Sequence, residues 1–218
     1  IDVRRECVRA AAGVQHAARE LGNLITSKKM DTELYQVAAA ALHAASSRGT
    51  RELANTLFPL PPGKEGKPLP PITQLLTMKG DANNGRLIYN TTGTCHKCHI
   101  VNKIGREIGP DLSEIGSKLS PQAMFESIIY PSAGISHNYE AYSLVLTSGT
   151  TVNGLITSET DDSISIKSDD AIVRTFKMAE VDEKMKQKTS LMPADLQKVM
   201  TTQEIVDVVD YMQTLKKK

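Results

Sequence analysis

The residues with the clearest chemical potential lie in one short string, Thr94-Cys95-His96-Lys97-Cys98-His99. Two thiols three positions apart, followed directly by an imidazole, match the way in which a c-type haem is attached to a protein. Each thiol adds across a vinyl group of the haem to form a thioether, and the adjacent imidazole reaches the iron. The string therefore predicts one covalent haem c, with Cys95 and Cys98 as attachment points and His99 as an axial ligand.

Two other chemistries use closely spaced thiols, and the surrounding sequence disfavours both. A structural zinc site takes four ligands, usually with a second Cys or His pair at suitable spacing. The remaining candidate ligands are isolated from one another in the sequence: Cys7, His16, His43 and His137. A redox dithiol of the thioredoxin type lies between a strand and a helix, whereas the sequence around Cys95 has a helical pattern. Zinc and dithiol chemistry are therefore the less favoured alternatives.

Iron bound to His99 takes a sixth ligand or keeps an open position. Met192 is the preferred sixth ligand, because Leu191-Met192-Pro193 lies in a stretch without helical or strand period, where a loop can hold a thioether against the haem. His137, just before a strand-rich region, is the rival, and an open or water-ligated site is the third alternative. Other methionines lie in helical or polar contexts and are interpreted as gap-filling residues: Met78, Met124, Met185 and Met212.

Residues 1–60 have the pattern of packed helices with small apolar faces. Apolar residues recur every three to five positions in the first half, and the stretch from Tyr35 to Ala45 is nearly all apolar or alanine. Asp31 or Thr32 can cap the second helix, and residues 51–58 can form a third. We expect an antiparallel helical array, either a remnant of a helical repeat or a plain helical cap.

A proline-rich segment follows this array. Residues 60–71 include five prolines and two glycines, a composition that favours extended chain over helix or sheet. We therefore expect a linker over residues 61–77 and a second domain over residues 78–218.

The second domain combines helical and strand patterns. Residues 81–90 look helical, Ser120 followed by Pro121 can begin another helix, and a capping box at Thr201 begins the last one. Between the last two helices the hydrophobic period changes to two, which indicates strands. Four strand candidates follow this period: 141–147, 151–156, 163–167 and 172–176. The expected fold is mainly α, with a small antiparallel β-sheet or barrel inserted at about 139–180.

Further residues occur in a recognisable order around the cysteine string. In chain order these are Gly85, Tyr89, Gly109-Pro110-Asp111-Leu112, Met192-Pro193 and Tyr211. This order resembles that of class I cytochromes c, in which the first and last helices cross at a small residue beside an aromatic one. The resemblance implies a cytochrome c fold, and it implies that the backbone carbonyl of Pro110 orients the iron-binding imidazole.

The chain between His99 and Met192 is longer than in a small cytochrome c, and the strand-rich region occupies the extra length. This pattern is similar to the haem-binding domain widespread in planctomycetes and verrucomicrobia, and the similarity covers about residues 78–215. The segments with counterparts there are Tyr130-Pro131-Ser132, Asn138-Tyr139-Glu140, the strand at Gly154, and Ser190-Leu191-Met192-Pro193. In that family the domain often closes a large exported protein, after helical repeats and sometimes after a β-propeller resembling sugar dehydrogenases.

The function expected from these features is electron transfer through a haem with His/Met ligation, without bond chemistry by the chain itself. The family resemblance implies a periplasmic or otherwise exported location, with a redox protein or a fused dehydrogenase domain as partner. The alternative is a haem enzyme or a gas or redox sensor with an exchangeable sixth ligand, where His137 or Arg174 could serve as distal acid or base. A third possibility, compatible with electron transfer, is a module that docks to a dehydrogenase or scaffold.

Composition excludes some partners and sets two smaller expectations. The chain has 26 basic and 25 acidic residues, a net charge of +1, so it lacks the basic field that holds nucleic acid. No stretch approaches the roughly 18 consecutive apolar residues of a membrane span. A start at Ile1 without a leader pattern is expected of a processed chain or a piece of a longer one. Cys7 is expected to be a small buried residue on a helix.

Overall fold

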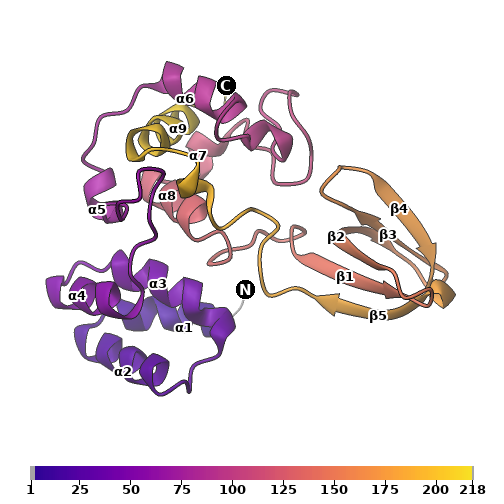
Figure 1. Ribbon diagram of the computed structural model, residues 1–218, viewed down its shortest axis with the longest axis horizontal. Coiled ribbons are helices and arrows are strands. Elements are labelled where there is room, and N and C mark those ends of the chain that lie inside the picture. Colours follow the sequence, from indigo (N-terminus) through magenta and orange to yellow (C-terminus); the bar gives the residue numbers. More distant parts are fainter. Residues whose placement is uncertain (1–2, 218) are drawn as a thin grey trace.

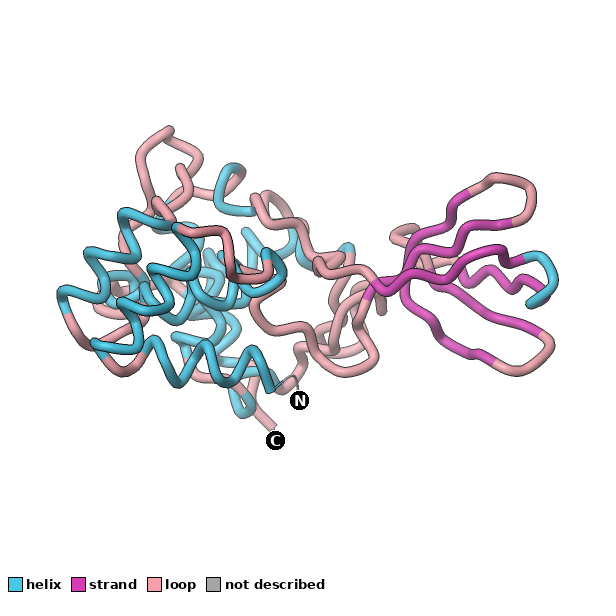
Figure 2. Tube along the Cα trace, turned by 90° about the horizontal axis from the view of Figure 1, so that it is seen from below, coloured by secondary structure: helices cyan, strands magenta, loops and turns pink. Residues whose placement is uncertain are grey.

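The structure, a computed structural model, describes residues 3–217. A helical body carries one antiparallel sheet, which projects from it on a neck of loops (Figures 1 and 2). The prediction of a helical chain with a small antiparallel β insertion is confirmed at the level of helices and sheet. No helix in the described range is long and apolar enough to cross a bilayer.

The N-terminal part is a group of four helices, drawn in indigo and purple in Figure 1. They are α1 (Val3–Ala12), α2 (Gln15–Thr26), α3 (Tyr35–His43) and α4 (Arg48–Leu57). α3 is the most buried of them, because its run of alanines lets α1 and α4 pack closely against it. The predicted helical array is thus present, with one helix more than the pattern indicated.

Two expectations for this part are wrong. The side chain of Asp31 caps no helix, and its carboxylate instead forms ion pairs with Arg4 and Lys188. Cys7 is exposed, and the buried position on that side of α1 belongs to its neighbour Val8. The Cys7 error arises because the helical period in a short, polar segment does not say which face meets the rest of the chain. The Asp31 error arises because its partners, Arg4 and Lys188, lie far away in the sequence.

The remaining helices lie in the upper part of Figure 1. They are α5 (Ile72–Leu75), α6 (Ala82–Asn90), α7 (Ile115–Lys118), α8 (Pro121–Ile129) and α9 (Thr202–Thr214). The predicted start signals are confirmed for α8, where the Ser120 hydroxyl accepts from the Ala123 amide, and for α9, where Thr201 and Glu204 form a capping box.

The proline-rich segment is not extended throughout. Its backbone folds back on itself, since the Gly63 amide donates to Lys67 and the Leu69 amide donates to Pro61. Leu69, together with Ile72 and Leu75 of α5, is buried. One hydrophobic cluster takes in these side chains, the N-terminal helices, α8 and α9, so the segment packs against both helical groups.

The five strands form one antiparallel sheet in the order β4-β3-β2-β1-β5. Their bounds are β1 (Ala141–Leu146), β2 (Thr151–Glu159), β3 (Ser163–Lys167), β4 (Val173–Lys177) and β5 (Val181–Lys186). The side chains of Leu144, Ile164 and Ile166 form a separate small core on one face. In the described residues β4 and β5 are edge strands, so the hydrogen-bonded ladder is an open sheet and not a closed barrel.

β5 was not expected, and it extends the insertion beyond 180 to Lys186. Its sequence, Val-Asp-Glu-Lys-Met-Lys, is mostly charged and mostly exposed, so it lacks the apolar alternation by which strands are predicted. Backbone pairing with β1 defines it, from Tyr142 opposite Lys186 to Leu146 opposite Val181. Charged side chains on an edge strand also discourage pairing with other chains.

Candidate functional site

The framework of the candidate site is the crossing of α6 and α9. A Cβ atom at Gly85 would lie 1.9 Å from the backbone oxygen of Asp207, so only glycine allows the two backbones to approach this closely. Beside the crossing, the rings of Tyr89 and Tyr211 meet edge to face, with centroids 5.6 Å apart. The small residue and the aromatic pair expected at this crossing are therefore in contact.

The buried carboxylate of Asp207 joins α6 and α9 at their crossing. Asp207 on α9 accepts hydrogen bonds from the Asp81 amide at 2.9 Å, the Asn84 side chain at 2.7 Å and the Gln203 side chain at 2.8 Å. Two of these donors, Asp81 and Asn84, lie in the first turn of α6, where free backbone amides favour negative charge. α9 thus supplies part of the N-terminal cap of α6.

The cysteine string follows α6 directly and curls into one tight turn. The amides of Cys98 and His99 both donate to the Cys95 carbonyl, at 3.0 and 2.9 Å. Thr94 enters the turn with a left-handed φ of 51°, and the Tyr89 hydroxyl donates to the His99 carbonyl at 3.4 Å. The turn places the two thiols and the imidazole on one short, internally bonded piece of backbone.

The chain after the string folds back over it. The amides of Ile108 and Gly109 donate to the Cys98 carbonyl, at 3.0 and 2.7 Å. Gly105 has a φ of 119°, and a Cβ there would lie 2.1 Å from the His99 oxygen. A Cβ at Gly109 would lie 2.4 Å from Cε1 of His99. Both glycines are required for this loop to close on the histidine.

His99 is held by one specific hydrogen bond. Its Nδ1 lies 2.8 Å from the Pro110 carbonyl oxygen, so Nδ1 carries the proton and donates, and the lone pair of a neutral ring lies on Nε2. Burial lowers the pKa of His99, while the Pro110 carbonyl opposes that change. The resemblance to class I cytochromes c implied this pairing, and the geometry leaves a neutral imidazole with one nitrogen free to bind a metal.

The pKa values of the two thiols are shifted in the opposite direction from those of a reactive dithiol. Burial raises the pKa of Cys95 to about 12, and burial also raises the pKa of Cys98, against the opposing effect of nearby Arg106. A redox dithiol needs a lowered pKa, and a zinc ligand needs a thiolate. In the described residues no cluster of three or more His, Cys, Asp or Glu side chains gathers around a common point. These environments fit thiols whose sulfur is consumed in a thioether.

Met192 lies on a different segment, after the sheet and before α9. Its side chain is partly buried and packs against the main hydrophobic cluster, as does Leu112 just after the Pro110 turn. Its amide donates to the Ser190 hydroxyl at 3.1 Å. The Met192 loop therefore borders the main hydrophobic cluster, as does the segment that follows the Pro110 turn.

A second methionine near the string was missed by sequence reasoning. Met200 is 1% exposed, and a Cβ at Gly93 would lie 3.3 Å from its sulfur and 3.2 Å from the Cys95 sulfur. Met200 therefore borders the attachment thiol. The only sequence signal was its place one residue before the Thr201 cap, which does not distinguish a core residue from a ligand.

The rival residues lie elsewhere. His137 is exposed in a turn within the neck, and Arg174 on β4 is ion-paired with Asp170. Among the described residues, neither His137 nor Arg174 forms a hydrogen bond or an ion pair with His99. In comparisons with known proteins, no protein-family model and no curated protein sequence matches the chain.

Proposed function

We propose that the chain binds one haem c covalently and transfers electrons. Cys95 and Cys98 would hold the haem through thioethers, and His99 and Met192 would ligate its iron. The observation that carries this proposal is the His99–Pro110 hydrogen bond of 2.8 Å, which leaves Nε2 of a neutral imidazole free directly beside two protonated thiols. When bound, the haem supplies a one-electron couple between ferrous and ferric iron.

The chain's own residues hold and tune the group. The Pro110 carbonyl fixes the tautomer of His99 and increases the basicity of its ligating nitrogen. Met192 contributes a neutral, polarizable sulfur, which favours the reduced state relative to a second imidazole. The glycines of the loop and the α6–α9 crossing keep these groups in place without taking part in any bond chemistry. The chain thus acts as an electron carrier and is not itself proposed as an enzyme.

The first experiment tests covalent attachment. The chain is produced together with a haem-maturation system, denatured, and extracted with acidified organic solvent. We expect haem absorbance to stay with the polypeptide and the mass to rise by one haem. Cys95→Ser/Cys98→Ser should lose both signals, while the exposed thiol variant Cys7→Ser, the matched control, should keep them. Complete extraction of haem from the unmodified chain would contradict the proposal.

A second measurement separates electron transfer from the alternative of an enzyme or sensor. A methionine-ligated haem gives a low-spin reduced spectrum and, when ferric, a weak far-red absorption band. A high-spin spectrum that shifts on addition of carbon monoxide would instead indicate an exchangeable sixth position. The far-red band without a rapid carbon monoxide response is the expected result for a carrier.

Partner and location follow from the same proposal. The side chains of Lys97, Lys103 and Arg106 are exposed beside the cysteine string, which suits an acidic redox protein or a fused dehydrogenase domain. An exported location such as the periplasm is proposed because thioether formation takes place there. If the basic side chains steer the partner, the rate of electron exchange with an anionic reagent should fall as salt is raised, and that with a neutral reagent should not.

A further inference from the structure

The N-terminal helices are hydrogen-bonded to the neck at a buried serine, Ser132. Ser132 is 6% exposed and lies in the chain that leaves α8 toward the sheet. Its amide donates to the Gln36 side chain of α3, and its carbonyl accepts from Arg5 of α1, both at 2.9 Å. Next to it, Arg9 donates to the Ala133 carbonyl at 2.8 Å. Two N-terminal helices therefore hold the outgoing chain of the neck.

The same serine also holds the chain that returns from the sheet. The Ser190 amide donates to the Ser132 hydroxyl at 2.9 Å, and the Ser190 hydroxyl accepts from the Met192 amide at 3.1 Å. A continuous path of hydrogen bonds thus runs from α1 and α3 through Ser132 and Ser190 to the backbone of Met192.

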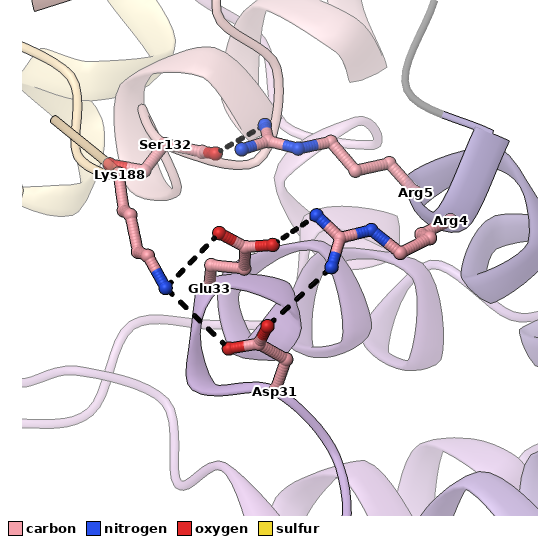
Figure 3. A network of polar contacts seen from close by, with 6 residues as sticks. All are labelled: Arg4, Arg5, Asp31, Glu33, Ser132 and Lys188. Atoms are coloured by element: carbon pink, nitrogen blue, oxygen red, sulfur yellow. Dashed lines mark hydrogen bonds and ion pairs between the residues drawn. The ribbon is translucent and has the colours of Figure 1, made fainter. Parts of the chain in front are cut away.

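A charged cluster ties the returning chain to the N-terminal helices a second time (Figure 3). Lys188 lies 3.5 Å from Glu33 and 3.9 Å from Asp31, and Arg4 of α1 pairs with both acids. The Glu33 side chain is 14% exposed, so its ion pairs with these two cations lie partly out of solvent. Exposed ion pairs contribute little one at a time, but here two cations bridge two acids between separate parts of the chain.

We propose that the N-terminal helices position the Met192 loop, and that Ser132 and Lys188 are positioning residues for the sixth haem ligand. This inference rests on the proposed function, in which Met192 binds the iron. α1 and α3 hold the outgoing chain at Ser132, and Ser132 together with Asp31 and Glu33 holds the returning chain, so the thioether is presented at a fixed place although it follows a long insertion. Neither Ser132 nor Lys188 is proposed to touch the haem.

The test compares loss of methionine ligation with global unfolding. In Ser132→Ala and Lys188→Gln, the temperature at which the far-red band disappears should fall by more than the temperature of global unfolding measured by circular dichroism. In Lys188→Arg, the far-red band should disappear at the same temperature as in the unmodified chain. Lys184→Gln, which removes a lysine paired with Glu159 inside the sheet, is the matched control and should behave as the unmodified chain.

A second readout needs no haem signal. In Ser132→Ala the Ser190 amide loses its acceptor, and its hydrogen exchange should accelerate by about tenfold, while amides in α6 should not change. The inference would be overturned if, in both variants, the temperature at which the far-red band disappears fell by the same amount as the global unfolding temperature. It would also be overturned if the band were as heat-stable as in the unmodified chain and the Ser190 amide exchanged at an unchanged rate. If the unmodified, haem-loaded chain has no far-red band, Met192 ligation itself fails, a result distinct from failure of the positioning role.

Discussion

At the scale of single residues, the candidate site depends on one imidazole and on how it is oriented. The Pro110 carbonyl accepts a hydrogen bond from Nδ1 of His99, and Gly109 leaves room for the ring. The cysteine spacing and His99 could be singled out from the sequence, because their chemistry depends on neighbours in the chain, whereas the role of Pro110 was implied by the family resemblance. The position of Met200 beside Cys95 was not, since that proximity depends on how the last helix packs.

The two methionines give a matched pair of variants. Met192→Leu should remove the far-red band of the oxidised protein and lower the reduction potential, because a thioether ligand is lost. Met200→Leu, a substitution of similar volume in a buried position, should keep the band and change the unfolding free energy by less than about 1.5 kcal/mol. Absorption and redox titration check both variants. Loss of the band in Met200→Leu alone would assign the ligand to Met200.

Gly109 tests the orientation of the histidine. In Gly109→Ala the new methyl group would overlap the ring of His99, so the ring must turn away from the Pro110 carbonyl or the loop must open. We expect a lower yield of attached haem and an altered low-spin spectrum. Gly49→Ala on α4, where the nearest atom would lie 3.4 Å away, is the control and should show neither change. A normal spectrum in Gly109→Ala would argue against the orienting role of Pro110.

At the scale of elements, the caps were predictable and the edge strand was not. Ser120 and Thr201 begin α8 and α9 as expected, because a cap bonds to amides two or three residues away in the sequence. β5 is made of charged residues and exists through its backbone pairing with β1, so no local pattern marks it. The same limit applies to Asp31, whose partners come from two distant segments.

The α6–α9 crossing offers a test at this scale. Asp207→Asn keeps the size of the side chain but replaces one carboxylate oxygen by an NH2 group, which cannot accept a hydrogen bond from the Asp81 amide or the Asn84 side chain. We expect the unfolding free energy to fall by about 1–3 kcal/mol, the usual cost of leaving buried polar groups unpaired. Asp210→Asn, an exposed position on the same helix, should change it little. Urea unfolding measures the unfolding free energy of the two variants, and equal values would show that Asp207 does not stabilise the crossing.

At the scale of the whole molecule, the N-terminal helices and the second helical group share one core. His43 of α3 stacks on Tyr130 at the end of α8, with ring centroids 6.4 Å apart, and its Nε2 lies 2.8 Å from the Phe58 carbonyl. The composition predicted two helical groups and a segment between them. It did not predict their contacts, because residues that meet across them are far apart in the chain.

This contact predicts a pH dependence. Burial lowers the pKa of His43, an effect larger than the opposing hydrogen bond to Phe58. The unfolded chain therefore binds a proton more readily than the folded one, and stability contributed by neutral His43 should be lost as the pH falls below about 6.5. His43→Gln can keep the bond to Phe58 without titrating, so its unfolding free energy should fall less between pH 7 and 5. His16→Gln, at an exposed position, should follow the unmodified chain, and identical pH profiles for all three would contradict the prediction.

The sheet begins and ends at one place. The Gln187 amide donates to the Ala141 carbonyl at 2.7 Å, so the first and last residues of the insertion are already joined across a single pair of strands. Figure 2 shows the sheet projecting from the helical body. The insertion meets the rest of the chain again at β3, where the Lys167 ammonium donates to the Glu107 carbonyl at 3.0 Å, in the loop after the cysteine string. Strands beyond these contacts could change in length without rerouting the helices, as long as the Ser132–Ser190 and Lys167–Glu107 contacts are kept.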